Sequence, residues 1–575
     1  MFPLSLLQIA RLPGVVVPTL RRVFVPAGRP NTPPLFELVT PVPVSLMLYR
    51  PSLFYDTWWF FLSSYPDPVF RELLCGVITF GARVSYVGPP KHIVLPNLVS
   101  ATSSPEIITG VVASELAAGR LLPLPSEPQL SLPFVSSPLC LVPKPNGRWQ
   151  RIHHLSAPSG SSVNDFVDPT FAALQFVRFD EVVASVTQMG RGSFLVKRDL
   201  KDAFRHVPLS PLDLWLFGFC WDRFYIELCL PFGLRTAPFI FNLFAEGVHW
   251  CCESLFPDGG RGVFTLHHYL DDFVFVFPPH CPYTEMVISR FERLLIELGV
   301  VLNQPKSMSG RQIPVLGILV DTDLMEVRLP LDKQQRAASS VAEVLARGSV
   351  SFSTLESLIG FLSYCAKVAP LGRTFTRRMW NSLGDLRGLP HHAQRRLSVG
   401  LRKDLYWWRD FLSSWNGRSI ITERRPRVSL FTDASSLFGI GGYYLCEGQA
   451  MADIPLRNCF WERPRESRHI NTMELFAVLR ALRRWSSEWT GCQVVVHIDN
   501  EAAFHAIRSG SIRGGAMDTL RALLLVAAGD DLRLTACWLP SAENGLADAF
   551  SRFQFSRVAD ILPQLSPLLP PDGQC

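Results

Sequence analysis

The 575-residue sequence predicts a multidomain α/β (α+β) protein in which a helical segment separates two α/β regions. Three observations lead to this class. The chain is too long for one hydrophobic core, because single domains usually hold about 100–200 residues. Short apolar strands alternate with helical stretches over residues 106–330 and again over residues 428–555. Residues 331–427, between them, are basic and follow a helical period.

The two ends of the chain carry weaker signals. Residues 1–105 are rich in proline and aromatic residues, and we expect an N-terminal extension whose role the sequence does not indicate. Residues 556–575 are rich in proline and leucine, and we expect a loose C-terminal tail.

The composition also indicates the cellular environment of the protein. The 13 cysteines form no Cys/His array with zinc spacing, which favours buried thiols in a reducing compartment. The sequence has no apolar run that could span a bilayer and no continuous apolar core of a signal peptide. We therefore expect an intracellular protein of the cytoplasm or nucleus that is neither secreted nor bound to a membrane.

In the region 106–330, predicted strands carry aspartates at their ends. Asp199 follows the strand Ser193 to Arg198, and Asp271 and Asp272 occupy a tight turn between two apolar strands. If these strands are neighbours, the three carboxylates meet at one edge of a sheet. Such hard oxygen ligands suit a pair of Mg²⁺ ions about 3.5–4 Å apart, which phosphoryl transfer uses. Taken singly, each motif also fits a solvated surface turn.

Acidic residues follow the same pattern in the region 428–555. Asp433 and Asp499 each end a predicted strand, Glu474 lies in the first turn of a predicted helix from Thr472 to Trp485, and Asp548 lies near the end of the region. Hydrolysis of a phosphodiester by two metals requires a similar cluster. An alternative for Glu474 is a capping box with Asn471, which would make it a helix-stabilising residue only.

Six motifs of the first region resemble those of retroelement reverse transcriptases, in the same order. The resemblance implies a right-hand polymerase with fingers and palm over 106–330 and a helical thumb or connection over 331–427. The motifs are Leu141 to Arg151, Phe194 to Phe204, Leu230 to Pro238, Tyr269 to Asp272, Leu298 to Lys306, and Val315 to Ile318.

The resemblance implies roles for individual residues. Asp199 and Asp271 would ligate both metals with help from Asp272, and the carbonyl of Leu200 would be a further ligand. Phe204 would exclude a ribose 2′ hydroxyl, with a core aromatic as the alternative. The remaining nucleotide-binding candidates are Lys144 and Arg151 on the triphosphate, Phe232 against the incoming nucleotide, and Lys306 as proton donor to the pyrophosphate. Phe232 replaces a glutamine of some retroviral enzymes, and His154 an aspartate of many relatives.

The second region resembles ribonuclease H. Asp433, Glu474, Asp499 and Asp548 match its D-E-D-D order, and Asn544 to Arg552 is similar to the retrotransposon form of the last motif. The histidine-bearing loop of retroviral enzymes is missing here. The two resemblances together imply two Mg²⁺ or Mn²⁺ ions at each of two active sites. They also imply RNA template, DNA primer, RNA–DNA hybrid and deoxynucleoside triphosphates as partners.

The segment between the regions carries 17 Lys and Arg against 7 Asp and Glu between Leu331 and Arg427, a local charge of +10. Phosphate contacts from such a surface would bind a hybrid without sequence preference. We expect the interleaved tryptophans to be buried and the arginines to face the duplex. The basic residues are Arg373, Arg377, Arg378, Arg395, Arg396, Arg402, Lys403 and Arg409, and the tryptophans are Trp380, Trp407, Trp408 and Trp415.

Among retroelements, the motifs look most like those of DIRS-type elements, which mobilise with a tyrosine recombinase; a gypsy-type or pararetroviral origin is the alternative. The chain contains no recombinase or integrase motif, so a separately encoded one is expected. A domesticated, catalytically inactive nucleic-acid-binding scaffold is the alternative function. Seven acidic residues in catalytic order argue against it, because a scaffold has no need of unpaired acids near phosphates.

Overall fold

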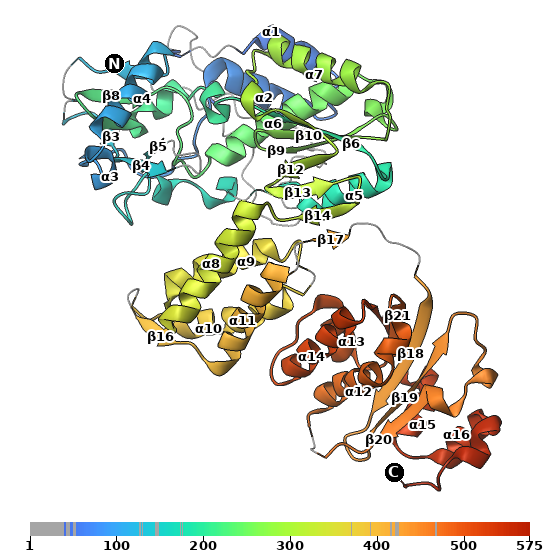
Figure 1. Ribbon diagram of the computed structural model, residues 1–575. Helices are drawn as coiled ribbons and strands as arrows, with labels where there is room; N and C mark the ends of the chain where they lie inside the picture. The colour runs from blue at the N-terminus through green and yellow to red at the C-terminus, as the bar shows by residue number, and fades with distance from the viewer. Residues whose placement is uncertain are drawn as a thin grey trace, which may run out of the picture. The chain divides into compact units, whose positions relative to one another are not determined.

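The computed structural model describes residues 39–41, 47–49, 53–125, 128, 130–143, 149–172, 174, 176–369, 371–390, 393–414, 417–419, 425–465 and 468–574. The chain divides into two compact units, one with residues 1–316 and 320–324 and the other with residues 317–319 and 325–575 (Figure 1). None of the helices in the described ranges combines the length and apolar character that a bilayer crossing needs.

A four-stranded sheet in the first unit has the strand order β11-β6-β10-β9. Its central strand β10 is antiparallel to both β6 and β9 and is almost entirely buried, as its apolar sequence DFVFVF predicts. The strands are β6 (Phe194–Asp199), β9 (Thr265–Tyr269), β10 (Asp272–Phe277) and β11 (Met308–Gly310).

Helices cover both faces of this sheet (Figure 1). Successive residues of a strand point to opposite faces, and two adjacent histidines of β9 show which helix lies on each. The His267 ring contacts the Ser185 hydroxyl of α5 at 2.8 Å, and the His268 ring contacts that of His249 of α6 at 2.8 Å. The helices are α5 (Phe179–Met189), α6 (Ala237–Ser254) and α7 (Thr284–Leu298).

Residues 1–105, for which we expected only an N-terminal extension, contain two helices that belong to this same unit. They are α1 (Tyr55–Leu62) and α2 (Pro68–Phe80), and their buried residues join the hydrophobic core of the sheet and α6. The fully buried Trp58 donates a hydrogen bond from Nε1 to the carbonyl of Leu298 at 2.9 Å. Much of the described part of the expected extension, between Leu53 and Val84, therefore contributes to the first unit's core.

The rest of the first unit contains a five-stranded sheet of order β1-β3-β7-β8-β2 and the hairpin β4–β5. Strands β7 and β8 form an antiparallel hairpin around Trp221, and a 3-10 helix (Pro211–Leu216) that begins at a proline precedes them. The elements are β1 (His92–Val94), α3 (Val99–Thr102), α4 (Pro105–Ala117), β2 (Leu121–Pro123), β3 (Phe134–Ser136), β4 (Leu139–Pro143), β5 (Trp149–His153), β7 (Gly218–Cys220) and β8 (Phe224–Glu227).

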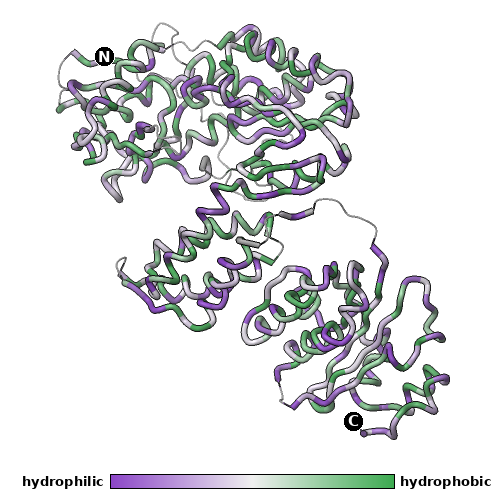
Figure 2. Tube along the Cα trace, in the orientation of Figure 1, coloured by the Kyte–Doolittle hydropathy of each residue, from purple (hydrophilic) through white to green (hydrophobic). Residues whose placement is uncertain are grey.

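Residues 331–414 of the second unit are mainly helical, as predicted. Hydrophobic and hydrophilic residues alternate along these helices (Figure 2), and Val341, Leu355 and Trp408 are among those buried between them. The elements of this part of the second unit are β14 (Glu326–Arg328), α8 (Leu331–Arg347), β15 (Ser349–Ser351), α9 (Phe352–Cys365), α10 (Arg377–Leu386), β16 (Gln394–Arg396), α11 (Val399–Ser414) and β17 (Arg418–Ser419). Strand β12 (Gln312–Val315) belongs to the first unit, and the residues of β13 (Ile318–Asp321) are divided between the two units.

The second unit ends in a five-stranded sheet of order β20-β19-β18-β21-β22, in which β21 is parallel to both β18 and β22. One hydrophobic cluster joins this sheet to α12, α13 and α14, and another joins it to α15 and α16. The elements are β18 (Arg427–Ala434), β19 (Ile440–Cys446), β20 (Cys459–Glu462), α12 (Ile470–Trp485), β21 (Gln493–Ile498), α13 (Glu501–Ser509), α14 (Ala516–Gly529), β22 (Arg533–Trp538), α15 (Gly545–Ser551) and α16 (Phe555–Ile561).

The prediction of a loose tail after residue 555 is wrong for the described residues, which reach 574. Val558, Leu562 and Leu565 are buried in the same cluster as Phe550 of α15. Val558 lies in α16, Leu562 directly follows the end of that helix, and Leu565 lies in the 3-10 helix Pro563–Leu568. Because Pro563 interrupts the helical spacing between them, the sequence pattern did not indicate this packing.

Candidate active sites

The three aspartates of the first unit lie at one edge of the four-stranded sheet. Asp199 ends β6 directly opposite Asp272, which begins β10. Asp271 lies in the turn that joins β9 to β10, and its carbonyl accepts a hydrogen bond from Leu200 at 2.9 Å. Leu270 has a φ of +53°, a left-handed conformation that closes this tight turn. The strand register therefore brings the predicted residues together.

Neighbouring polar residues fix two of these carboxylates. Asp199 accepts hydrogen bonds from Asn303 Nδ2 at 2.7 Å and from Lys306 Nζ at 3.1 Å. Lys197 Nζ lies 2.7 Å from an oxygen of Asp272. Asn303 and Lys197 were missed in the sequence, although Lys197 lies two positions before Asp199 and so on the same face of β6.

The electrostatics of this edge disfavour three free carboxylates without cations. Burial, followed by the charges of Asp272 and Asp199, raises the pKa of Asp271 to about 6. Burial also raises the pKa of Asp272, although Lys197 opposes this shift. One oxygen of Asp272, Oδ1, is buried without a hydrogen-bond partner in the part of the chain that the structure describes. These donors fit hard divalent cations, which would relieve the repulsion.

A cavity of about 840 Å³ adjoins the aspartates, and five predicted nucleotide-binding residues line it: Arg151, Leu200, Phe204, Phe232 and Lys306. Phe204 is half-buried, with its ring centroid 5.3 Å from that of Phe232, so it packs in the core and also faces the cavity. Arg151 is already bound, with Nη2 2.6 Å from Glu227. Lys144 lies outside the described residues.

Three acidic residues of the second unit converge more tightly. Ligand atoms of Asp433, Glu474 and Asp499 lie within 4.8 Å of one another, the one group of this kind that the described residues contain. Asp433 lies near the end of β18 and Asp499 directly follows β21. These strands are parallel, so both residues reach the same sheet edge. Glu474 approaches from α12, and the three residues line a cavity of about 560 Å³.

Burial and mutual repulsion dominate this second cluster. Burial, with the charges of Asp499 and Asp548, raises the pKa of Asp433 to about 6, although the Ser551 hydroxyl donates a hydrogen bond to it. Burial and the charges of Asp433 and Asp499 raise the pKa of Glu474 well above its ordinary value. Glu474 Oε2 is buried with no partner among the described residues. An unpaired buried oxygen amid carboxylates fits a divalent cation.

The capping-box interpretation of Glu474 is wrong. Helix α12 begins at Ile470, and the N-cap is His469, whose ring nitrogen accepts a hydrogen bond from the backbone of Asn471 at 3.3 Å. Asn471 therefore lies inside the helix, and its side-chain oxygen accepts a hydrogen bond from Asn500 at 3.1 Å. Glu474 faces the acidic cluster instead of the helix terminus.

Asp548 lines the same cavity but is not one of the three converging residues. It is held by two arginines, since Arg552 Nε donates to one carboxylate oxygen and Arg557 Nη1 lies 2.8 Å from the other. The structure therefore brings three of the four predicted residues together and places the fourth at the cavity wall, paired with cations.

In the basic helical segment, the prediction of buried tryptophans and solvent-facing arginines is only partly confirmed. Trp408 is fully buried, but Trp380 is 49% exposed, and Trp415 lies outside the described residues. Arg378 does not face solvent freely, because Nη1 lies 2.7 Å from the buried Asp404. Among the basic residues predicted to face the duplex, those that are exposed are Arg373, Arg395, Arg396, Lys403 and Arg409.

Comparison with known proteins gives one family match and several distant relatives. Residues 142–320 match the family model of reverse transcriptase (RNA-dependent DNA polymerase). The chain is similar to the Pro-Pol polyprotein of Feline foamy virus, with 24% identity over 238 residues, which cover 41% of this chain and 18% of the polyprotein. It is also similar to the Gag-Pro-Pol polyprotein of Human T-cell leukemia virus 3 (strain 2026ND), with 21% identity over 258 residues, or 43% of this chain and 16% of that protein.

The chain thus spans less than a fifth of the length of these two relatives. Among solved structures, it is similar to the foamy viral protease-reverse transcriptase dRH in complex with ds DNA, with a TM-score of 0.44 and 14% identity over 87% of this chain and 84% of that one. Residues 142–320 thus match the reverse transcriptase family model, and part of the chain is similar to retroviral polyproteins.

Proposed function

We propose that this chain is an RNA-directed DNA polymerase that extends a DNA primer on an RNA template with deoxynucleoside triphosphates. The observation that carries the proposal is the register of β6 and β10, which sets Asp199 opposite Asp272 inside the segment that matches the reverse transcriptase family. Together with Asp271, these residues would hold two Mg²⁺ or Mn²⁺ ions. When bound, the ions would activate the attacking hydroxyl and stabilise charge on the leaving group.

The chain's own residues supply the rest of the nucleotide site. Lys306 lies 3.1 Å from Asp199 and lines the cavity, where its ammonium can donate a proton to the leaving pyrophosphate. Burial alone would lower the pKa of Lys306. The hydrogen bond from Lys306 to Asp199 and the negative charges of the three aspartates outweigh burial and raise this pKa, so Lys306 stays protonated. The ring of Phe204 would exclude a 2′ hydroxyl, and Arg151 and Lys144 would bind the triphosphate.

We further propose a ribonuclease H activity that degrades the RNA strand of an RNA–DNA hybrid. Asp433, Glu474 and Asp499 would hold two divalent ions, and the buried, unpartnered oxygen of Glu474 supports this assignment. Asp548 would complete the set after exchanging Arg552 and Arg557 for a cation. The resemblance of the four residues to the D-E-D-D order of ribonuclease H is the second support.

The same motifs support a proposal about origin and partners. We propose that the chain comes from a DIRS-type retroelement, acts inside the cell, and depends on a separately encoded recombinase or integrase. The catalytically inactive scaffold is the competing function. Its weakness is physical, because two sets of buried, mutually repelling carboxylates would destabilise a scaffold without serving it.

Two single substitutions test both activities in one preparation. Asp271→Asn should abolish primer extension on an RNA template and leave cleavage of a labelled hybrid intact. Asp499→Asn should do the reverse. If both variants retain both activities at wild-type rates, both site assignments are wrong. If the wild-type chain shows neither activity but binds hybrid, the scaffold function holds.

A further inference from the structure

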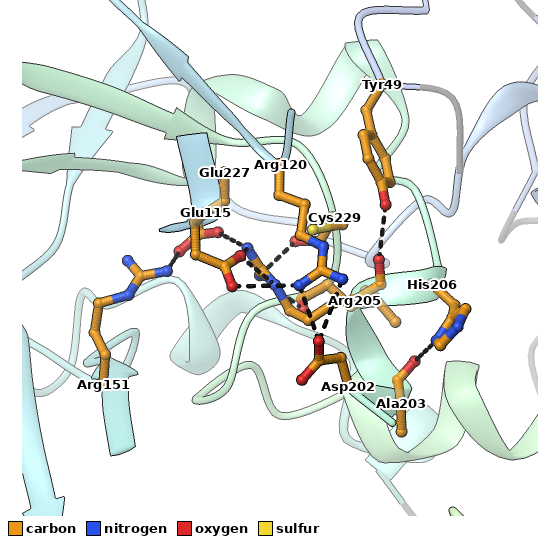
Figure 3. A network of polar contacts seen from close by, with 11 residues as sticks. Tyr49, Glu115, Arg120, Arg151, Asp202, Ala203, Arg205, His206, Glu227 and Cys229 are labelled. Atoms are coloured by element: carbon orange, nitrogen blue, oxygen red, sulfur yellow. Dashed lines mark hydrogen bonds and ion pairs between the residues drawn. The ribbon is translucent and has the colours of Figure 1, made fainter. Parts of the chain in front are cut away.

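A network of six charged side chains lies beside the nucleotide cavity (Figure 3). It contains three arginines and three carboxylates, so it is neutral overall. Its members are Arg120, Arg151, Arg205, Glu115, Asp202 and Glu227. They come from different elements of the first unit, including α4, β5 and β8, and several of them line the cavity.

Glu227 is the centre of this network and is fully buried at the end of β8. One of its oxygens accepts a hydrogen bond from Arg151 Nη2 at 2.6 Å, and the other accepts one from Arg205 Nη2 at 2.7 Å. One carboxylate thus connects the hairpin strand β5 with the segment that follows Asp199. Figure 3 shows the two guanidinium groups on the carboxyl group of Glu227.

Arg205 fixes the segment that carries Phe204. It is buried, and it also donates to Glu115 from Nε at 2.9 Å and to the carbonyl of Leu230 at 3.2 Å. Because Phe204 directly precedes Arg205, the hydrogen bond from Arg205 to Glu227 also fixes the backbone at Phe204. Tyr49 donates a further hydrogen bond to the carbonyl of Arg205 at 3.1 Å.

Arg151 is bound on one side only. Its guanidinium stands 4.9 Å from the ring centroid of Phe219, and its side chain is 7% exposed. Its second amino group, Nη1, is buried without a hydrogen-bond partner in the described part of the chain. Since Arg151 lines the cavity, Nη1 can donate a hydrogen bond to an anionic oxygen while Nη2 stays on Glu227.

The charges of this network are strongly coupled. Burial alone would raise the pKa of Glu227, but Arg151, Arg205 and His153 lower it to about 2. Burial lowers the pKa of His153 to about 4, so this ring is neutral at pH 7 and the two arginines carry the compensation. Buried ion pairs contribute little net stability compared with apolar packing. These ion pairs instead fix the orientation of the guanidinium groups of Arg151 and Arg205.

We propose that Glu227 is a positioning residue for DNA synthesis that holds Arg151 against the triphosphate and, through Arg205, Phe204 against the sugar. This role rests on the proposed polymerase function. Phe232, which lines the same cavity, offers Arg151 no hydrogen-bond acceptor, whereas Glu227 supplies one from β8.

The test measures KM and kcat for dTTP on poly(rA)/oligo(dT), with hybrid cleavage followed in parallel. Glu227→Gln should raise KM at least tenfold and change kcat by less than about threefold. Because this variant leaves two buried arginines facing an amide, a second variant removes one charge of each sign. Glu227→Leu/Arg205→Met keeps the net charge of the network at zero, so it should melt closer to the wild-type temperature than Glu227→Gln does, while KM stays raised because Arg151 has lost its carboxylate partner.

Two controls separate positioning from stability. Asp213→Asn breaks a buried ion pair with Arg83 in the same unit, away from the cavity, and should lower the melting temperature without changing KM. In an Arg151→Ala background, Glu227→Gln should add less than a twofold further change in KM, because the residue it positions is already absent.

Recovery of the wild-type KM in the double variant, or a full additional effect in the Arg151→Ala background, refutes the positioning role and leaves the polymerase assignment standing. Absence of extension by the wild-type chain refutes the polymerase function itself, and the positioning role with it. A tenfold KM effect that persists in the stable double variant establishes the role.

Discussion

Replacing Asp433 by Asn should have opposite effects on stability and on hybrid cleavage. Asp433 is 5% exposed, and burial with the nearby charges of Asp499 and Asp548 raises its pKa from 3.8 to about 6. The folded state therefore binds this proton more tightly than the unfolded state does. Its stabilising contribution is complete below pH 4 and is lost as pH rises through about 6.

The size of the effect follows from the shift. Two pKa units correspond to about 3 kcal/mol, since each unit is worth about 1.4 kcal/mol. At pH 7 without metal, the Asn variant has no buried negative charge at this position and so avoids the cost of ionising Asp433. Its side chain can still accept the hydrogen bond from Ser551. For a unit of this size, about 3 kcal/mol corresponds to a rise of about 6–12 °C in melting temperature. At pH 4 the two proteins should melt together.

Calorimetry of the full chain in chelator, at pH 4 and pH 7, measures this difference. Added Mg²⁺ should then stabilise the wild type by mass action and leave Asp433→Asn unchanged. Hybrid cleavage by the variant should fall by at least 100-fold. Asp560→Asn, on the exposed face of α16, is the matched control and should shift neither property. A metal-free variant less stable than the wild type at pH 7 would refute the repulsion argument.

Four further predictions follow from the geometry. Phe204→Val should admit ribonucleotides at least tenfold more readily in single-nucleotide incorporation, and an unchanged ratio would leave Phe204 a packing residue. Neutralising the exposed Arg395 and Arg396 should reduce the salt slope of hybrid binding by up to about one log–log unit per lost phosphate contact; an unchanged slope places them off the duplex. Glu474→Gln should cut hybrid cleavage by orders of magnitude while DNA synthesis continues, and near-normal cleavage contradicts a ligand role. Leu562→Ala should destabilise the second unit by about 2–4 kcal/mol in thermal unfolding, whereas a neutral result would mean that the tail packs weakly.

The two acidic sheet edges could be predicted because strand ends carry short-range signals. Asp199, Asp271 and Asp433 each end or adjoin an apolar strand, and the register needed to bring them together follows from sheet pairing. The family order of the motifs then fixed which acidic residues belong together. The start of α12 was less predictable, since the N-cap is His469 and the capping pattern at Asn471 is a coincidence of spacing.

The contacts that shape the nucleotide cavity could not be predicted. Glu227 and Arg205 are 22 positions apart, and no local pattern indicates that these two charged residues are buried. Their pairing depends on how two sheets pack, which no local pattern encodes. Arg378 was assigned to the duplex face for the same reason, although it is paired with the buried Asp404.

The most direct test of the central claim is primer extension by the wild-type chain on a defined RNA template with Mg²⁺, analysed together with an Asp199→Asn variant. The account predicts templated DNA products from the wild type, loss of at least 1000-fold in the variant, and undiminished hybrid cleavage in both. Equal extension by the two proteins, or none by a folded wild-type chain that binds Mg²⁺ and primer–template, would contradict it.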